Sequence, residues 1–404
     1  DGRGTATVRG PAMGEKNGRR EWITALACGA LSMAFAAPGC NRSGSGAEGA
    51  ANEWRVGVYL SLSGADTSFG VDTREGIALA VDEINAAGGV KGRPIKLLFE
   101  DDKSNPQEAS NKVLQLIHRD KVVALLGEVS SARSKAAGIV ANKNKIPMIA
   151  PSATNAEVTK VGPFVFRACY TDDKQGQVGA RFVVESLGKK RLAILFASDD
   201  LYSSGLADEF RREAKKLGAE VIVEKSFLKS ETNFTTYLNE IRDTKPEIVY
   251  APVYYNAMVP IARQAKAAGI PGNQFVGGDG WHADSLVVDA GEEIEGAYFT
   301  NHFSPDVPWP HSQAFVKAYE ERFKREPSAL AAQGYDAAKL LADSIGRAKG
   351  DTPESIRDAI ADTKDFRGAT GKIAINAERN ADKPLVIVQL KGKKFTYHST
   401  VGEP

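Results

Sequence analysis

The chain has 404 residues, of which 42% are hydrophobic and 25% charged, and its formal net charge is +1. This length is too great for one hydrophobic core, so two lobes are expected. The near balance of charge argues against a nucleic-acid partner, because such partners select strongly basic surfaces.

The first part of the chain is predicted to be a targeting segment followed by a tether. Basic residues at 17–20 precede the mostly apolar residues 22–37, which have the length of a signal-peptide core and are short for a membrane span. The sequence APGC that ends at Cys40 resembles a bacterial lipobox, with alanine where leucine is usual. We therefore expect residues 1–39 to be upstream sequence and a signal peptide, and Cys40 to be lipidated. Residues 40–52 are rich in Gly, Ser and Ala, which suits a flexible tether.

Repeated strand–helix units follow the tether. Strands are predicted at 54–60, 95–101, 122–126 and 148–150, where apolar runs have strand length. Asp72 is expected to cap the first helix, which ends at the glycine pair 88–89. A second helix is predicted at 106–119, and a third follows Ser130 and Ser131. This alternation predicts a parallel sheet with helices on both faces.

A second series of units follows a strand at 164–170 that is expected to leave the first sheet. Its predicted helices are 175–187, 205–217, 235–244 and 256–268, and its strands are 191–197, 221–224, 248–251 and 274–277. Residues 297–303 are expected to cross back. Helices at 313–324, 329–349 and 353–363 and β-like segments at 371–375, 385–390 and 395–398 complete the prediction.

Two polar turns follow neighbouring predicted strands, at residues 127–131 (GEVSS) and 151–154 (PSAT). In an open parallel sheet both turns lie at the carboxyl ends of adjacent strands, where such sheets bind ligands. Hydroxyl groups beside the free N–H groups of a helix start suit an anion, either a carboxylate or a phosphate. Simple capping of the helix by Ser130 or Ser131 would explain the same residues equally well.

Several motifs in order resemble the type I periplasmic binding proteins, in the leucine/isoleucine/valine-binding branch of ABC-transporter receptors. The resemblance covers residues 53–398. It rests on the opening strand and loop VGVYLSLSGADTSFG (56–70), the helix and turn GIALAVDEINAAGGVKG (76–92), the acid pair 101–102, the two polar turns, and residues 167–176 and 366–376.

The resemblance implies an α/β fold of two Rossmann-like lobes, each with a parallel central sheet, joined by three crossover strands. Residues 53–170 and 302–370 would form lobe 1, and residues 171–301 and 371–404 would form lobe 2. A small ligand would be clamped between them.

The family's ligand contacts carry over to individual residues. Ser131, Ser152 and Thr154 match lobe 1 positions that hold the α-carboxylate and ammonium of an amino acid. Asp279 in lobe 2 matches an acid that faces the ammonium, and Tyr254 matches a tyrosine that faces the same head group.

Other matches concern the walls of the site. Tyr202 matches an aromatic residue of the cleft, Phe69 matches one that contacts the ligand side chain, and Tyr170 lies at the first crossover. Trp281 departs from the small residue expected after the acid, so an altered side-chain pocket is expected. Glu128 places a charge in a turn that is often neutral, either as a second polar contact or at a solvated edge.

The implied function is that of an extracytoplasmic receptor, lipid-anchored in the periplasm, which delivers a small amino acid to the permease domains of an ABC transporter. The aromatic walls favour a branched-chain or other apolar or aromatic amino acid, and small amides or aromatic acids also fit. We expect a monomer that contacts the membrane only through its anchor.

Two other classes of function use similar folds or residues. The same clamshell serves sensors in signalling systems, and the sequence does not separate sensing from transport. An enzyme is not expected, because the five histidines lack metal-binding spacing and the chain has neither a GxSxG elbow nor a GxGxxG turn. No catalytic residue, metal or cofactor is therefore predicted.

Overall fold

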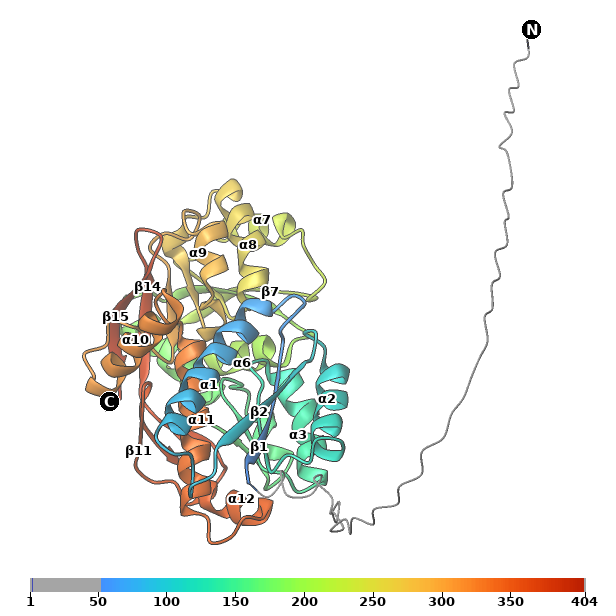
Figure 1. Ribbon diagram of the computed structural model, residues 1–404. Coiled ribbons are helices and arrows are strands. Elements are labelled where there is room, and N and C mark those ends of the chain that lie inside the picture. The colour runs from blue at the N-terminus through green and yellow to red at the C-terminus, as the bar shows by residue number, and fades with distance from the viewer. Residues whose placement is uncertain (1, 3–51, 403–404) are drawn as a thin grey trace, which may run out of the picture. The chain divides into compact units, whose positions relative to one another are not determined.

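The computed structural model describes residue 2 and residues 52–402 (Figure 1). The predicted signal segment, the lipidation at Cys40 and nearly all of the tether fall outside these residues. None of the described helices is long and apolar enough to cross a membrane.

The first sheet has five parallel strands in the order β2-β1-β3-β4-β5. The apolar side chains of β1, β3, β4 and β5 are buried, as expected for a parallel sheet, whereas those at 97–99 in the edge strand β2 are half-buried. The strands are β1 (Trp54–Leu60), β2 (Ile95–Asp101), β3 (Ala124–Leu126), β4 (Met148–Ala150) and β5 (Val165–Arg167).

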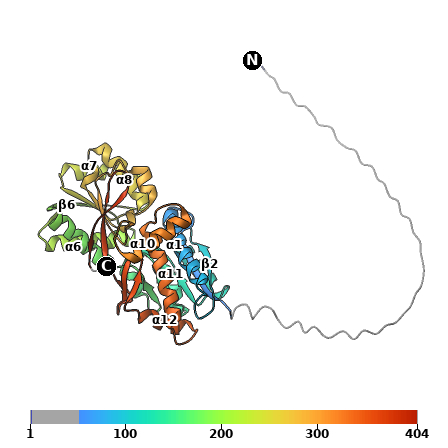
Figure 2. The same cartoon turned by 60° about the vertical axis from the view of Figure 1, so that its left-hand side comes forward.

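Helices cover both faces of the first sheet. α1 (Thr67–Ala86), α11 (Ala329–Arg347) and α12 (Pro353–Ala361) pack on one face. α2 (Pro106–His118) and α3 (Ser131–Lys143) pack on the other, and the short α4 (Glu157–Lys160) follows β4. Both views show α1 and α11 side by side, although more than half of the sequence separates them (Figures 1 and 2).

The second sheet has seven strands in the order β15-β14-β10-β9-β8-β6-β7. The run from β7 to β10 is parallel, and β14 and β15 extend it as antiparallel strands. The strands are β6 (Arg191–Ala197), β7 (Glu220–Phe227), β8 (Ile248–Ala251), β9 (Phe275–Gly277), β10 (Tyr298–Asn301), β14 (Leu385–Leu390) and β15 (Phe395–Val401).

The helices of the second half share one apolar cluster with this sheet. They are α5 (Asp172–Arg181), α6 (Leu201–Lys216), α7 (Thr235–Asp243), α8 (Tyr255–Ala268) and α9 (Asp284–Ala290). α10 (Pro310–Phe323) follows β10 and packs against α1 and α11 of the first half. α7, α8 and α9 lie together at the end of the molecule farthest from α12 (Figure 1).

The chain passes between the two sheets three times, after β5, after β10 and before β14. A small third sheet of β11 (Phe366–Gly368), β12 (Gly371–Ile375) and β13 (Ala381–Asp382) precedes the last passage. It packs into the core of the first sheet through Ile373, Ile375 and Ala381. The predicted α/β fold of two Rossmann-like halves is confirmed.

Two local predictions were wrong. Asp72 does not cap the first helix but lies inside α1, where Arg325 pairs with it at 2.6 Å. The helix begins at Thr67 because its buried face extends back to Phe69. The segment at 164–170 does not leave the sheet as a strand, since β5 completes the first sheet beside β4 and the crossover follows it.

Candidate ligand-binding site

The strand order of each sheet reverses at one point. β1 lies between β2 and β3 in the first sheet, and β6 lies between β7 and β8 in the second. Loops that leave the strands on either side of such a point diverge to opposite faces of the sheet, and the crevice between them is the usual ligand site. In the first sheet, the loop that carries Ser131 follows β3 and lies at such a crevice. In the second sheet, the loops that carry Tyr202 and Tyr254 follow β6 and β8 and lie at the corresponding crevice.

The first sheet presents buried hydroxyl groups at its carboxyl end. Ser131 begins α3 and Thr154 follows β4, and each is 1% exposed. Ser131 Oγ accepts a hydrogen bond from the backbone N–H of Asn155 at 3.2 Å, which ties the two polar turns together. Ser152 differs, because its Oγ donates to Gln333 Oε1 at 3.0 Å. Ser130 makes no side-chain capping bond to α3 within the described residues, so simple helix capping does not account for this turn.

An aromatic cluster joins the two halves. Tyr202 and Tyr254 stack with their ring centroids 4.7 Å apart and their planes 5° from parallel. Phe69 of α1 meets Tyr254 edge-on at 5.6 Å. Tyr202 OH accepts a hydrogen bond from the backbone N–H of Gly280 at 3.1 Å, so the turn after β9 is held against the tyrosine pair.

Asp279 is buried in that same turn with both carboxylate oxygens engaged. Gln175 Nε2 donates to Oδ1 at 2.8 Å, and His302 Nε2 lies 3.0 Å from Oδ2. Tyr170 stacks on the His302 ring at 3.7 Å between centroids. Burial lowers the pKa of His302 to about 4, so this imidazole is neutral at physiological pH. Asp279 and Tyr170 thus belong to one buried cluster.

Comparison with known proteins decides the family. A family model described as periplasmic binding protein matches residues 53–394. An amino acid binding protein of Pseudomonas aeruginosa is 31% identical over 304 residues, which are 74% of this chain and 79% of that protein. The chain belongs to the periplasmic binding protein family.

Two solved structures extend the comparison. A leucine-binding protein of Thermotoga maritima is 34% identical with a TM-score of 0.82, and the match covers 86% of this chain and 98% of that one. A solute-binding protein of an ABC transporter of R. palustris, in complex with benzoate, is 26% identical with a TM-score of 0.78 and coverage of 86% and 96%. The predicted family is confirmed, and this periplasmic binding protein is an ABC-transporter solute-binding protein, not an enzyme.

Asp172 is a buried acid beside Thr154 that the sequence motifs did not single out. It begins α5 directly after the first crossover, and its backbone N–H donates to Thr154 O at 2.9 Å. Its side chain is 2% exposed, and neither carboxylate oxygen has a hydrogen-bond partner among the described residues. Burial raises the pKa of Asp172 well above its ordinary value, which the nearby Thr154 side chain partly opposes. The only available sequence signal was the acid pair 172–173 at a helix start after a strand.

Trp281 lies beneath this site in the periplasmic binding protein. Its indole is fully buried, and Nε1 donates to Ala251 O at the end of β8 at 3.1 Å. A Cβ added at Gly277 would fall 2.2 Å from the indole, so the glycine makes room for the ring. The bulk of Trp281 is therefore accommodated in the core of the second half.

Glu128 is fully buried, which rules out the solvated edge. Its Oε1 accepts hydrogen bonds from the backbone N–H and the hydroxyl of Ser61, at 3.3 and 2.9 Å. Its Oε2 accepts from Arg133 Nε at 2.8 Å. Gly127 directs the chain inward with φ of +140°, and a Cβ there would lie 2.2 Å from Tyr59 O. Only glycine tolerates that combination.

Direct contacts hold the two halves together around the site. Tyr255 OH donates to Ala65 O at 3.0 Å, and Asn256 Nδ2 donates to Asp66 Oδ1 at 3.0 Å. On the other side of the site, Asn155 Nδ2 donates to Leu201 O at 2.8 Å. These hydrogen bonds join the two halves directly on both sides of the site.

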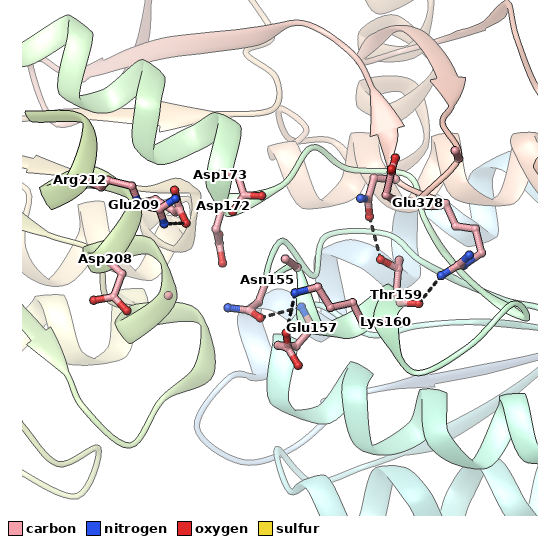
Figure 3. A pocket seen from close by; sticks show the side chains of 15 residues that line it. Asn155, Glu157, Thr159, Lys160, Asp172, Asp173, Asp208, Glu209, Arg212 and Glu378 are labelled. Atoms are coloured by element: carbon pink, nitrogen blue, oxygen red, sulfur yellow. Dashed lines mark hydrogen bonds and ion pairs between the residues drawn. The ribbon is translucent and has the colours of Figure 1, made fainter. Parts of the chain in front are cut away.

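A groove of about 590 Å³ opens beside Asp172, between α4, α6 and the β12–β13 turn (Figure 3). Acidic side chains outnumber basic ones along it, so it favours positively charged groups. Its charged residues are Glu157, Asp172, Asp173, Asp208, Glu209 and Glu378 against Lys160, Arg212 and Arg379.

Proposed function

We propose that this protein binds the zwitterion of an amino acid between its halves and delivers it to an ABC permease. The observation that carries the proposal is the meeting of hydroxyl groups and a helix start from one half with acids and tyrosines from the other. Ser131 and Thr154 would hold the α-carboxylate with free N–H groups of α3, because the positive end of the helix dipole favours an anion.

The ammonium group of the ligand would lie at the end of the site opposite the α3 start. Asp172 supplies a buried carboxylate whose oxygens lack partners among the described residues, and Asp279 lies in the same buried region. Tyr202, Tyr254 and the backbone carbonyl of Ser152 would complete the cage. Burial disfavours ionisation of Asp172 in the ligand-free protein, and a cationic ligand group beside it would stabilise the carboxylate form, so this buried acid suits an ammonium.

The side chain of the ligand would lie against aromatic rings. Phe69 and Tyr170 are the proposed walls, with Trp281 supporting them from below. The leucine-binding relative supports a branched-chain or other apolar amino acid. Its apolar contact would add to the binding of the head group.

Binding and closure would be coupled. A ligand that contacts both halves stabilises the closed state, whereas the open state retains only part of the contacts. The permease would recognise the closed form, and a lipid at Cys40 would keep the monomeric receptor at the outer face of the membrane.

We also propose the lobe boundaries given by the family resemblance, at residues 53–170 with 302–370 and 171–301 with 371–404. The packing of Ile373 and Ala381 in the core of the first sheet favours moving the last boundary to about residue 383.

An aromatic acid is the second candidate, because the benzoate-bound relative shares the fold. Such a ligand has no ammonium, so Asp172 would remain unpaired. This charge argument favours the amino acid. A role in sensing instead of transport would use the same site, and the presence of permease and ATPase genes beside this gene would decide against it.

A thermal-shift screen of the purified protein against the twenty amino acids and benzoate tests the proposal. A ligand at a hundred times its Kd stabilises the native state by about 2.7 kcal/mol, which gives a shift of several degrees. We expect at least one amino acid to raise the melting temperature. A shift with benzoate alone would contradict the proposal and support the second candidate.

A further inference from the structure

Arg133 lies at the centre of a buried ionic cluster at the edge of the site. It is 1% exposed and two residues beyond Ser131 on α3. Its Nη1 donates to Asp66 Oδ2 at 2.7 Å and its Nε to Glu128 Oε2 at 2.8 Å. Asp66 in turn accepts from Asn256 of the other half. The guanidinium is therefore fixed at the interface between the halves.

Two donors in this cluster lack partners among the described residues. They are Nη2 of Arg133 and the hydroxyl of Ser130, which is also 1% exposed. Asp66, which pairs with Arg133, accepts a hydrogen bond at its backbone oxygen from Phe69 N–H at 3.1 Å, so the ionic cluster lies next to Phe69. Tyr254 belongs to the aromatic cluster with Phe69, so the unpartnered donors lie on the side-chain end of the proposed site.

The net charge of the cluster limits which ligand groups can accept hydrogen bonds from these donors. One guanidinium faces the three carboxyl groups of Asp66, Asp102 and Glu128. Burial and the neighbouring Glu128 raise the pKa of Asp102 to about 8, so Asp102 is neutral at pH 7. The two remaining carboxylates outweigh the guanidinium by one negative charge. A further anion would be repelled, whereas a neutral acceptor satisfies the donors without adding charge.

We infer that Arg133 and Ser130 form a polar subsite that recognises a neutral hydrogen-bond acceptor, a hydroxyl or an amide carbonyl, on the ligand side chain. This inference rests on the proposed amino-acid function and narrows it. The preferred ligand has an apolar body that contacts Phe69 and one uncharged acceptor that reaches Arg133. Arg133 and Ser130 are thus specificity-determining residues.

Matched ligand pairs test the subsite in the wild-type protein. Calorimetry would compare leucine with asparagine, methionine with glutamine and valine with threonine, which are similar in size and differ in the acceptor. A hydrogen bond to a charged donor predicts that at least one acceptor-bearing ligand binds about 10- to 100-fold tighter than its apolar match. Aspartate and glutamate should bind more weakly than asparagine and glutamine.

Two variants test whether Ser130 and Arg133 cause a preference for the acceptor-bearing ligand. Ser130→Ala and Arg133→Lys should each reduce the ratio of affinities within the preferred pair by about 10-fold, because each removes a donor. Arg211→Lys on α6 is the matched control, since Arg211 pairs with Asp208 and Glu224 on the surface. Circular dichroism would verify folding. If Arg133→Lys does not fold, Ser130→Ala and the wild-type pairs decide.

The outcomes separate the two proposals. One outcome is that in all three pairs the apolar amino acid binds at least as tightly as the acceptor-bearing one. That result would overturn the polar subsite, and the proposed amino-acid function would stand. A preference that survives Ser130→Ala and Arg133→Lys unchanged also overturns it. If no amino acid binds at all, the proposed function itself fails, and the subsite with it.

Discussion

Asp172 and Asp279 are both buried acids near the proposed ammonium, but they differ in their partners. Asp279 is held by Gln175 and His302, whereas Asp172 has no hydrogen-bond partner among the described residues. The first is therefore expected to serve both structure and binding, and the second is expected to cost stability until a ligand binds.

Replacing each acid should separate these roles. Asp172→Asn should weaken amino-acid binding by about 2–4 kcal/mol but stabilise the ligand-free protein by ~1 kcal/mol, because burial disfavours the ionised carboxylate that the unfolded chain carries, a cost that the neutral amide does not have. Asp279→Ala should weaken binding by about 2–5 kcal/mol and also destabilise the ligand-free protein by ~1–3 kcal/mol, since two partners lose their acceptor. Calorimetry and urea unfolding measure both quantities.

The predictions for the two acids can each fail separately. A loss of affinity below ~1 kcal/mol in Asp279→Ala would remove Asp279 from the site. A less stable ligand-free Asp172→Asn would show that this carboxylate has a structural partner.

Asp102 makes stability depend on pH. Burial, with Glu128 adding to it, raises its pKa to about 8 from an ordinary value of 3.8. The folded state therefore holds a proton that the unfolded state releases, so this group lowers stability as pH rises from about 4 to 8, and the loss is complete above that.

Asp102→Asn should remove this dependence. Between pH 7 and 8 the wild type should lose up to about 1 kcal/mol of unfolding free energy relative to the variant. Urea unfolding at several pH values measures the difference, and the comparison cancels contributions from other groups. Parallel pH profiles for the two proteins would show that Asp102 is ionised in the folded state.

At the scale of elements, the backbone of the turn after β9 packs directly against the side chains of Tyr202 and Gln175. A Cβ added at Gly278 would fall 2.5 Å from both Tyr202 OH and Gln175 Nε2. The turn that carries Asp279 would have to move away from the tyrosine pair, and misplaced ligand groups lose much of their binding energy.

Gly278→Ala should therefore weaken ligand binding by at least ~10-fold, which is about 1.4 kcal/mol. Gly346→Ala in α11 is the control, because an added Cβ there lies 3.9 Å from its nearest neighbour, Val90. The control should bind normally and be stabilised by up to ~1 kcal/mol, since alanine favours helices over glycine. Equal affinities of the two variants in calorimetry would exclude a tight turn at Gly278.

At the scale of the whole molecule, closure depends on contacts outside the proposed ligand cage. Tyr255 and Asn256 donate to Ala65 and Asp66 across the halves. Because the open state lacks these bonds, removing them shifts the equilibrium toward the open form without changing the head-group contacts.

The double variant Tyr255→Phe/Asn256→Ala should bind about 5- to 30-fold more weakly, mainly through faster dissociation, from the loss of two hydrogen bonds of ~0.5–1 kcal/mol each. Stopped-flow fluorescence measures the dissociation rate. Asn111→Ala on α2 serves as a control, because among the described residues the Asn111 side chain bonds only to side chains of its own helix. An unchanged dissociation rate in the double variant would separate these contacts from closure.

Much of this fold follows from local sequence. β1, β2, β4, β6, β8, β12 and β14 begin and end at the predicted residues. α8 ends at Gly269, whose φ of +83° suits a glycine cap. Such features depend on the spacing of apolar residues and on turn residues that are neighbours in the chain. The position of the polar turns at strand ends follows from the same pattern.

The partners of the polar side chains were decided only by tertiary structure. Asp279 bonds to Gln175, 104 residues away, and Arg133 bonds to Asp66, 67 residues away. No local pattern identifies which buried acid is satisfied by the protein and which is left for a ligand. The sequence by itself determined the main elements and the family, and it predicted that the ligand binds at the carboxyl ends of the strands. Packing between distant segments determined the chemistry of the site, because hydrogen-bond partners are set by proximity in space.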